Sequence, residues 1–257
     1  MISIIHDLSS EIENLELVIF SDEHIGDPFC DMNFLKERIE YVKNNENVYC
    51  LLNGDIMDNA TTTSVGDTYS QTYSPDQQID IATELFMPIK DKILGITKGN
   101  HEHRTYKKEG IDIMKAVARN LGCLSFYSNT ALLLFIKFGT CKKKPSSKMM
   151  YSIYMKHGAG GGLKEGAKAI RLADMANIVD ADVYIHSHTH LAMALKEDFM
   201  RVDRLNCIAK PVTKLFVNTS ANLNYGGYGE TIGCKPASKD KPIICLSGHD
   251  RDLKAIV

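Results

Sequence analysis

The sequence contains no tryptophan and no pair of cysteines in a C-x-x-C arrangement. Its seven cysteines are scattered and odd in number, so we expect reduced thiols that lie mostly in the core. Neither sign of charge dominates, because the formal net charge is only −2. This balance excludes a protein that binds nucleic acid through an overall basic surface, although it leaves room for a local basic groove.

Long apolar runs are also missing. No stretch approaches the roughly 18 apolar residues that a membrane-spanning helix needs, so we expect no membrane partner. Residues 1–7 show no basic segment followed by a long apolar run, and we expect no signal peptide. Hydrophobic residues make up 44% of the chain and charged residues 24%, as in ordinary globular proteins. Because no linker divides the chain, we expect one soluble, cytoplasmic domain over residues 1–257.

Four apolar runs end in clusters of polar residues. The runs cover residues 15–20, 48–53, 92–97 and 182–185, and the clusters that follow them cover residues 21–24, 54–58, 99–103 and 186–190. Each run has the length and the bounding turn residues of a buried strand. Open α/β sheets bind their ligands at the carboxyl ends of the strands. We therefore expect one metal site to which all four strand ends contribute.

The rest of the chain suggests the remaining elements. An amphipathic helix over residues 31–44 would complete a parallel strand–helix–strand unit. Further helices are predicted from residue 79 to about Pro88, over 110–121 and over 163–176, and residues 61–74 read as a loop that covers the site. Strands are predicted over 131–138 and 150–155, and shorter, largely antiparallel strands over 191–195, 211–217, 243–246 and 253–257.

Seven of the nine histidines fall in four short clusters. An H-x-H pair on an extended segment points both imidazoles the same way, because the side-chain period of a strand is two. His188 and His190 are thus predicted to bind neighbouring ions, and Asp22 and His24 to act together while Glu23 points away. Mixed imidazole and carboxylate ligands favour manganese, iron or zinc over calcium or magnesium.

The order of these blocks resembles the calcineurin-like metallophosphoesterase superfamily over nearly the whole chain. The blocks are Asp22-x-His24, Gly54-Asp55-x-x-Asp58, Gly99-Asn100-His101-Glu102, His157 and His188-x-His190. Segments 157–162 and 225–229 resemble a bacteriophage-type branch. The resemblance implies an α/β fold, a four-layer αββα sandwich of two mixed sheets flanked by helices. Ser187 departs from the glycine that the family usually has there, and we expect this small residue to keep the turn and to add a hydroxyl contact.

Position by position, the resemblance implies a dinuclear centre of divalent transition-metal ions, with manganese favoured and iron or zinc as alternatives. It implies one ion on Asp22, His24 and His190, a second ion on Asn100, His157 and His188, and a bridge between them by Asp55. A hydroxide shared by the ions would attack the phosphoester, and His101 would protonate the leaving oxygen. Ions roughly 3.5–4 Å apart suit such an in-line displacement.

Other residues near these blocks keep two interpretations each. Glu102 either orients His101 or binds nearby backbone. His103 and Arg104 either contact the phosphate of the substrate or are surface charges. Asp58 either orients a ligating imidazole or stabilises a turn.

The glycine cluster after His157 and two tyrosine-bearing loops also have two interpretations. Gly160 and Gly161 either let backbone N–H groups approach an anion or only form a tight turn. The tyrosines of residues 61–74 and 225–228 either stack on nucleic-acid bases or pack internally.

The arginine content near the blocks bears on the substrate class. Phosphatases of this family usually place arginine just after the second block, but Asn59 follows here, and the nearest arginine is Arg104. We therefore expect a phosphodiesterase or nuclease that acts on single-stranded nucleic acid or nucleotide diesters. A phosphomonoesterase is the alternative, and a non-catalytic scaffold stabilised by metal is a remote one. A homodimer is compatible with the sequence.

Overall fold

The computed structural model describes residues 1–62, 64, 68–160, 162 and 164–257, and two six-stranded mixed sheets form its centre. Sheet A has the strand order β1-β6-β7-β8-β10-β9, and sheet B has the order β12-β11-β2-β3-β4-β5. The strands of sheet A are β1 (Ile2–Asp7), β6 (Ala131–Phe138), β7 (Met149–Lys156), β8 (Val183–His186), β9 (Met193–Asp203) and β10 (Ile208–Asn218). Those of sheet B are β2 (Asn14–Phe20), β3 (Val48–Asn53), β4 (Ile93–Thr97), β5 (Tyr127–Ser128), β11 (Ile243–Ser247) and β12 (Leu253–Ile256).

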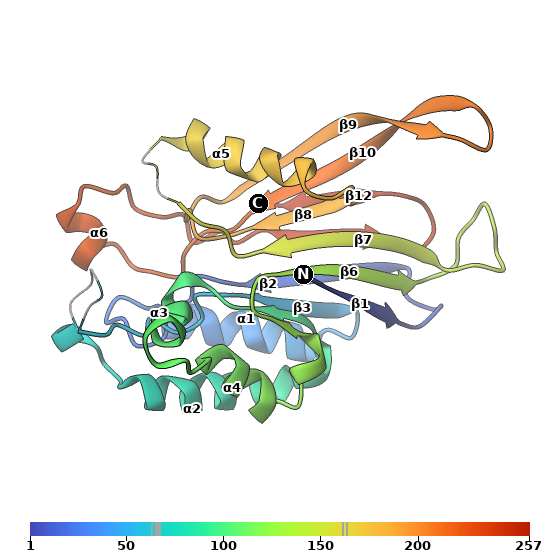
Figure 1. The fold of residues 1–257 in the computed structure, drawn as a ribbon. Coiled ribbons are helices and arrows are strands. Elements are labelled where there is room, and N and C mark those ends of the chain that lie inside the picture. The colour runs from blue at the N-terminus through green and yellow to red at the C-terminus, as the bar shows by residue number, and fades with distance from the viewer. Residues whose placement is uncertain (63, 65–67, 161, 163) are drawn as a thin grey trace.

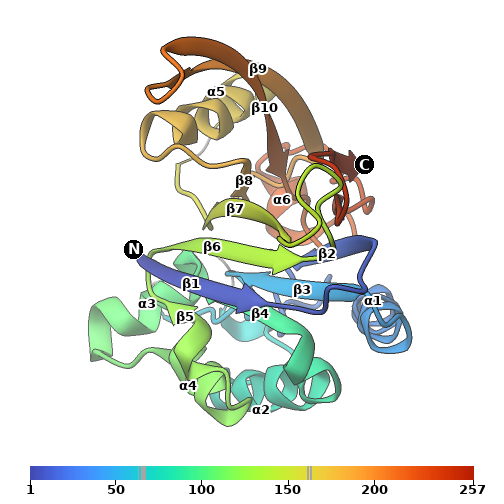
Figure 2. The ribbon, with the colours of Figure 1, turned by 90° about the vertical axis from the view of Figure 1, so that its right-hand side faces the viewer.

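Helices cover the outer faces of both sheets, as Figure 2 shows. The α-helices are α1 (Met32–Asn44), α2 (Pro75–Phe86), α3 (Asn100–Glu109), α4 (Ile113–Asn120), α5 (Glu165–Ala173) and α6 (Gly227–Thr231). Short 3-10 helices cover Thr68–Ser70, Met87–Lys92, Leu124–Phe126 and Asp174–Asn177. Helices α1, α2 and α4 lie on sheet B, and α5 lies on sheet A. The predicted four-layer αββα sandwich is confirmed.

Three apolar clusters correspond to the three spaces between these layers. The central one joins the facing sides of the two sheets, for example Leu51 of β3 and Leu134 of β6. A second lies under α1, α2 and α4, and a third packs Leu172 of α5 against sheet A. Burial of apolar surface on both faces of each sheet holds the strand ends in fixed positions.

The predicted parallel unit β2–α1–β3 is confirmed. Helix α1 begins after Asp31, whose side chain accepts a hydrogen bond from the backbone N–H of Phe34. Strands β2 and β3 pair in parallel, with Phe20 opposite Leu52. Their carboxyl ends therefore lie side by side, and the chain delivers the residues after both strands to the same edge of sheet B.

Two helices begin where apolar periodicity gave no signal. Helix α2 starts at Pro75 rather than at residue 79, because Ser74 and Gln77 form a capping box and proline suits the first turn. Helix α3 was not predicted and begins at Asn100. Its only buried residue is Glu102, so it has no apolar face that could reveal it.

The prediction of short strands after His190 was wrong for β9 and β10. These strands pair in antiparallel fashion over 11 residues each. Figure 1 shows their hairpin at the upper right, at the end of the molecule that lies away from α3. Strand β1, which pairs in parallel with β6, was not predicted either. No helix among the described residues combines the length and the apolar character that crossing a membrane needs.

Candidate metal centre

The predicted blocks meet at the end of the sheets towards which β7 points in Figure 1. Sheet B supplies the residues that follow β2, β3 and β4, and sheet A supplies those that follow β7 and β8. The side chains are Asp22, His24, Asp55 and Asn100 from sheet B, and His157, His188 and His190 from sheet A. The candidate centre therefore straddles the boundary between the two sheets.

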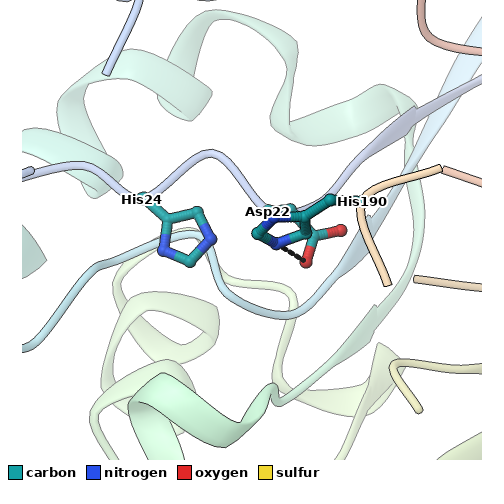
Figure 3. A group of neighbouring side chains, drawn as sticks. All are labelled: Asp22, His24 and His190. Carbon is teal, nitrogen blue, oxygen red and sulfur yellow. Dashed lines mark ion pairs between the residues drawn. The ribbon is translucent and has the colours of Figure 1, made fainter. Parts of the chain in front are cut away.

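One group of potential ligands consists of Asp22, His24 and His190 (Figure 3), whose ligand atoms lie within 4.8 Å of one another. Nε2 of His190 is 3.3 Å from Oδ1 of Asp22. The carboxylate of Asp22 is fully buried and accepts hydrogen bonds from the backbone N–H of His188 and from the hydroxyl of Thr219, over 3.1 and 3.2 Å. These donors fix the carboxylate, which sequence reasoning assigned to the first ion.

The second group consists of Asp55, His157 and His188, again with ligand atoms within 4.8 Å. Nε2 of His157 is 3.1 Å from Oδ2 of Asp55 and 3.2 Å from Oδ1 of Asn100. Asn100 thus lies beside this group, and that it binds an ion stays a prediction. That Asp55 bridges two ions stays a prediction.

Acceptors fix the orientation of two imidazoles. Nδ1 of His24 lies 3.2 Å from the Asp58 carboxylate, and Nδ1 of His157 lies 2.6 Å from the backbone carbonyl of Asn53. Because both partners can only accept, each Nδ1 carries a proton and each Nε2 of a neutral ring presents a lone pair. Nε2 of His24 is buried without a hydrogen-bond partner in the described structure. An unpartnered buried lone pair in this place fits a bound cation.

The charges of the centre also fit a cation. Within the described ranges, the ion pairs of Asp22 and Asp55 are to histidines only. Burial favours the neutral ring of His157, but Asp55 and Asp22 outweigh it and raise the pKa of His157 to about 10. Burial and the neighbouring His157 lower the pKa of His188 to about 4. Without an ion, the two buried carboxylates thus favour a proton on His157. A divalent ion in this position would neutralise both carboxylates instead.

The backbone at the centre is strained. Asp22, His24, Asp55, His188 and His190 have φ values of 52°, 51°, 49°, 69° and 52°. These lie in the left-handed region, which side chains other than glycine, asparagine and aspartate rarely adopt. The expectation that the H-x-H histidines converge because their segment is extended was therefore wrong. They converge on a left-handed turn, and such strain concentrates at functional sites.

His101 lies between Asp55 and Asp58. Its backbone N–H donates to Oδ1 of Asp55 over 2.9 Å, and its Nδ1 lies 3.0 Å from Oδ1 and 2.7 Å from the backbone carbonyl of Asp58. Burial disfavours the Asp58 carboxylate, but hydrogen bonds from His101 and His24 outweigh burial and hold the pKa of Asp58 well below its ordinary value. Of its two interpretations, Asp58 takes the one in which it orients imidazoles.

Two neighbours of His101, Glu102 and Arg104, contact different groups. The buried carboxylate of Glu102 accepts hydrogen bonds from the backbone N–H groups of Gly99, Asp55 and Met57, over 2.9, 3.0 and 3.1 Å. Glu102 thus binds backbone and does not face His101. Arg104 donates to Nε2 of His101 over 3.0 Å.

His103 is exposed and stacks on Tyr106, with 5.6 Å between the ring centroids. Of its two interpretations, the surface position fits this geometry.

The glycine cluster does not build a described anion site. A side chain at Gly160 would collide with the guanidinium of Arg171, which also donates to the carbonyl of Ala159 over 3.2 Å. A side chain at Gly158 would collide with His186, whose Nδ1 is 2.9 Å from Oδ1 of Asn218. Both glycines have positive φ values, 107° at Gly158 and 88° at Gly160, so the turn explains them, and the second predicted glycine, Gly161, lies outside the described residues.

Sequence reasoning missed three residues at the centre. Asn53 binds His157 through its backbone, Thr219 binds Asp22, and Gln71 donates to Oδ2 of Asp58 over 2.8 Å. Only Asn53 carried a usable signal, because it directly precedes Gly54-Asp55 at the end of an apolar run. Gln71 belongs to the predicted cover loop, whose residues 63 and 65–67 lie outside the described ones.

No family model matches the chain, and no curated protein sequence matches it. Solved structures with a similar arrangement include a predicted phosphoesterase from Streptococcus pneumoniae, with 13% identity and a TM-score of 0.39 over 95% of this chain and 88% of the other. Zinc-complexed Vps29 from Entamoeba histolytica has 12% identity and a TM-score of 0.36 over 94% and 97%. The nuclease MPE from Pseudomonas putida has 10% identity and a TM-score of 0.32 over 93% and 87%.

Proposed function

We propose that this chain is a metal-dependent phosphoesterase with a dinuclear centre, and that it hydrolyses phosphodiesters. The observation that carries the proposal is the convergence of Asp/His groups at the same strand ends, two of the three described groups being Asp22, His24 and His190 and Asp55, His157 and His188, with Nε2 of His24 buried and without a partner in the described structure. One ion would be held by Asp22, His24 and His190. The other would be held by Asn100, His157 and His188, with Asp55 shared between the two.

Two divalent ions in this position would neutralise phosphoryl oxygens and make water a stronger nucleophile at neutral pH. The protein supplies the remaining functions. Asp58 holds the ring of His101 through Nδ1, so that Nε2 points to where a leaving oxygen would lie. In the structure Arg104 covers this Nε2. We infer that the phosphate of the substrate takes over the guanidinium, so that Nε2 of His101 can take up a proton from solvent and pass it to the leaving oxygen.

The small number of guanidinium groups in contact with His101 among the described residues favours a diester over a monoester. Asn59, at the position where an arginine would serve a monoester, is fully buried and donates to the carbonyl of His101 over 2.7 Å. Arg104 is then the one guanidinium among the described residues that contacts His101. A monoester dianion is best met by several such forks, whereas a diester carries a single charge.

The organic arm of a diester needs a surface on which to lie. Tyr69 is 98% exposed and Tyr225 is 51% exposed, and Tyr69 lies in the loop whose Gln71 contacts Asp58. Flat exposed rings suit the bases of single-stranded nucleic acid or of a nucleotide diester. The side chain of Tyr228, also considered for this role, lies outside the described part of the structure.

The direct test is a hydrolysis screen of the purified chain with added manganese. Single-stranded DNA and RNA, cyclic nucleotides and phosphomonoesters would be compared at equal metal loading. We expect cleavage of diesters that a chelator abolishes and manganese restores. Turnover that persists after complete removal of metal would refute the metal dependence, and a lack of turnover on every ester would leave a metal-stabilised scaffold.

A further inference from the structure

Asn53 connects the two sheets at the candidate centre. This residue ends β3 of sheet B and is fully buried. Its Nδ2 donates to the hydroxyl of Ser187 over 2.7 Å and to the carbonyl of Lys156 over 3.2 Å, and both partners belong to sheet A or to the turn after it. Its Oδ1 accepts from the hydroxyl of Thr97 over 2.6 Å. Because the Lys156 carbonyl can only accept, it fixes which end of the amide faces sheet A.

Ser187 is the partner of Asn53 in the turn that carries the last two histidines. It is fully buried, its backbone N–H donates to the carbonyl of His157 over 2.9 Å, and its carbonyl accepts from the N–H of Thr189 over 2.7 Å. The Ser187 side chain therefore contacts sheet B through its hydroxyl, by the hydrogen bond from Asn53. A glycine in the same place would keep the backbone bonds and lose that hydrogen bond.

Both residues of the pair touch the second group of potential ligands. The backbone carbonyl of Asn53 accepts from Nδ1 of His157 over 2.6 Å, and Ser187 directly precedes His188. Asp55, the third member of the group, lies two positions after Asn53. The pair thus joins the sheet A ligands of this group to the sheet B ligand by a bond buried from water, where a hydrogen bond is strong and an unpaired group is costly.

We propose that Asn53 and Ser187 are a positioning pair that sets the distance between the sheet A and sheet B halves of the metal centre. The inference rests on the proposed function, because it assigns the pair to the ion held by Asp55, His157 and His188. Residues that hold ligands in place typically contribute roughly 10–100-fold to metal affinity. The Asn53–Ser187 bond would supply this contribution without touching an ion.

The test is a double-mutant cycle on metal affinity. Apo wild type, Ser187→Ala, Asn53→Leu and the double variant would be titrated with Mn²⁺ by calorimetry, and the coupling of the two ions would be followed by electron paramagnetic resonance. We expect Ser187→Ala to weaken one binding step by roughly 10-fold and to reduce the coupled signal. In the Asn53→Leu background, Ser187→Ala should have no further effect, because its partner is already absent.

The matched control is Tyr151→Phe. Tyr151 of β7 is fully buried and donates to the carbonyl of Ser247 at the end of β11 over 2.7 Å, so it joins the same two sheets at their opposite end. Removal of the Tyr151 hydroxyl should lower the temperature of unfolding about as much as Ser187→Ala does. It should leave both steps of Mn²⁺ binding unchanged.

Three results would count against the inference. If Tyr151→Phe weakens Mn²⁺ binding as much as Ser187→Ala, the pair acts through general stability alone. If wild type binds two ions and Ser187→Ala binds them equally well, the inference is overturned and the proposed function stays intact. Wild type that takes up no ion overturns the proposed function, and the inference with it. Should Asn53→Leu fail to fold, the comparison of Ser187→Ala with Tyr151→Phe still decides.

Discussion

The guanidinium of Arg104 lies 3.0 Å from Nε2 of His101 and donates a hydrogen bond to it. The same side chain donates to the carbonyl of Asp58 over 3.1 Å, and Nδ1 of His101 lies 2.7 Å from that carbonyl, so both ring nitrogens of His101 are engaged. The ring of His101 is thus held in a fixed orientation. The guanidinium of Arg104 covers Nε2, the nitrogen that would face a substrate, and can move away from it. This relationship yields separate predictions for the two residues.

His101→Asn should slow hydrolysis by roughly 10²–10⁴-fold, the usual cost of a lost general acid. The loss should be much smaller for an ester with a good leaving group, because that oxygen needs no proton. Metal content should stay close to that of wild type, since no ligand is removed. Steady-state rates on a pair of esters that differ in leaving group, with metal analysis of the same samples, check this. Loss of metal would identify His101 as a ligand instead.

Arg104→Ala should raise KM more than it lowers kcat, because the guanidinium is expected to pair with a phosphoryl oxygen of the bound substrate. A lost charged hydrogen bond corresponds to roughly 10–100-fold in kcat/KM. Lys107→Ala is the matched control, because Lys107 is exposed on the same helix. Equal effects of the two substitutions would show that Arg104 contributes only general positive charge.

Asp55→Asn should lose at least one ion and nearly all activity. The amide keeps the shape of the side chain and its place between His101 and His157, but it has no charge to offset two cations. Metal content by mass spectrometry and turnover at saturating manganese would be measured together. Full activity in this variant would rule out a shared carboxylate.

An aryl phosphodiester should be hydrolysed faster than the matching monoester. The reason is that Arg104 is the one guanidinium among the described residues that contacts His101, and that Asn59 stands buried where an arginine would serve a monoester. Rates on the two esters at equal metal loading decide the matter, and a clear preference for the monoester would place the chain among the phosphatases.

The buried group of Glu23, Arg38 and Lys241 allows a prediction about stability. One oxygen of Glu23 accepts from Arg38 over 3.0 Å and from Lys241 over 2.7 Å. Glu23→Gln leaves two buried cations without their counter-ion and should cost roughly 3–5 kcal/mol of unfolding free energy. Lys241→Met leaves the Arg38–Glu23 pair intact and should cost less.

The same group gives a dependence on pH. Burial lowers the pKa of Lys241 from 10.5 to about 8 in the folded chain. Between these values the unfolded chain binds more protons than the folded one, so stability rises with pH, by at most about 1.4 kcal/mol per unit. The difference in unfolding free energy between wild type and Lys241→Met should therefore grow from pH 8 to pH 10 in urea titrations. A constant difference would contradict this.

Those parts of the fold that carry an apolar signal could be predicted from the sequence. Strands β2, β3 and β4 are buried runs that end in Gly or Asp clusters, and α1 has a clear apolar face. Helix α3 could not be predicted in this way, because its stability comes from Glu102 and the backbone it caps rather than from an apolar stripe. The lengths of β9 and β10 could not be predicted either, since the two strands pair with each other beyond the core and need no apolar run there.

The residues of the candidate site could be predicted because strand ends bring them together, but their surroundings could not. Thr219 reaches Asp22 across 197 positions, and Ser187 reaches Asn53 across 134. Such contacts between distant segments leave no periodicity in the sequence. The direction of Glu23, by contrast, was predicted correctly, although its partner Lys241 was not.

The left-handed backbone at five of the predicted ligands has a consequence for evolution and engineering. Each such residue costs roughly 1 kcal/mol relative to a glycine in the same conformation, so together they reach several kcal/mol, which is a large part of the net stability of an ordinary domain. A change to glycine would relieve this cost, but at Asp22 and Asp55 it would also remove buried hydrogen bonds, so the gain is largest where the side chain is partly exposed, as at His190. A library selected only for thermal stability should therefore lose His190 first, and a chain that keeps all five residues is one in which use has outweighed stability.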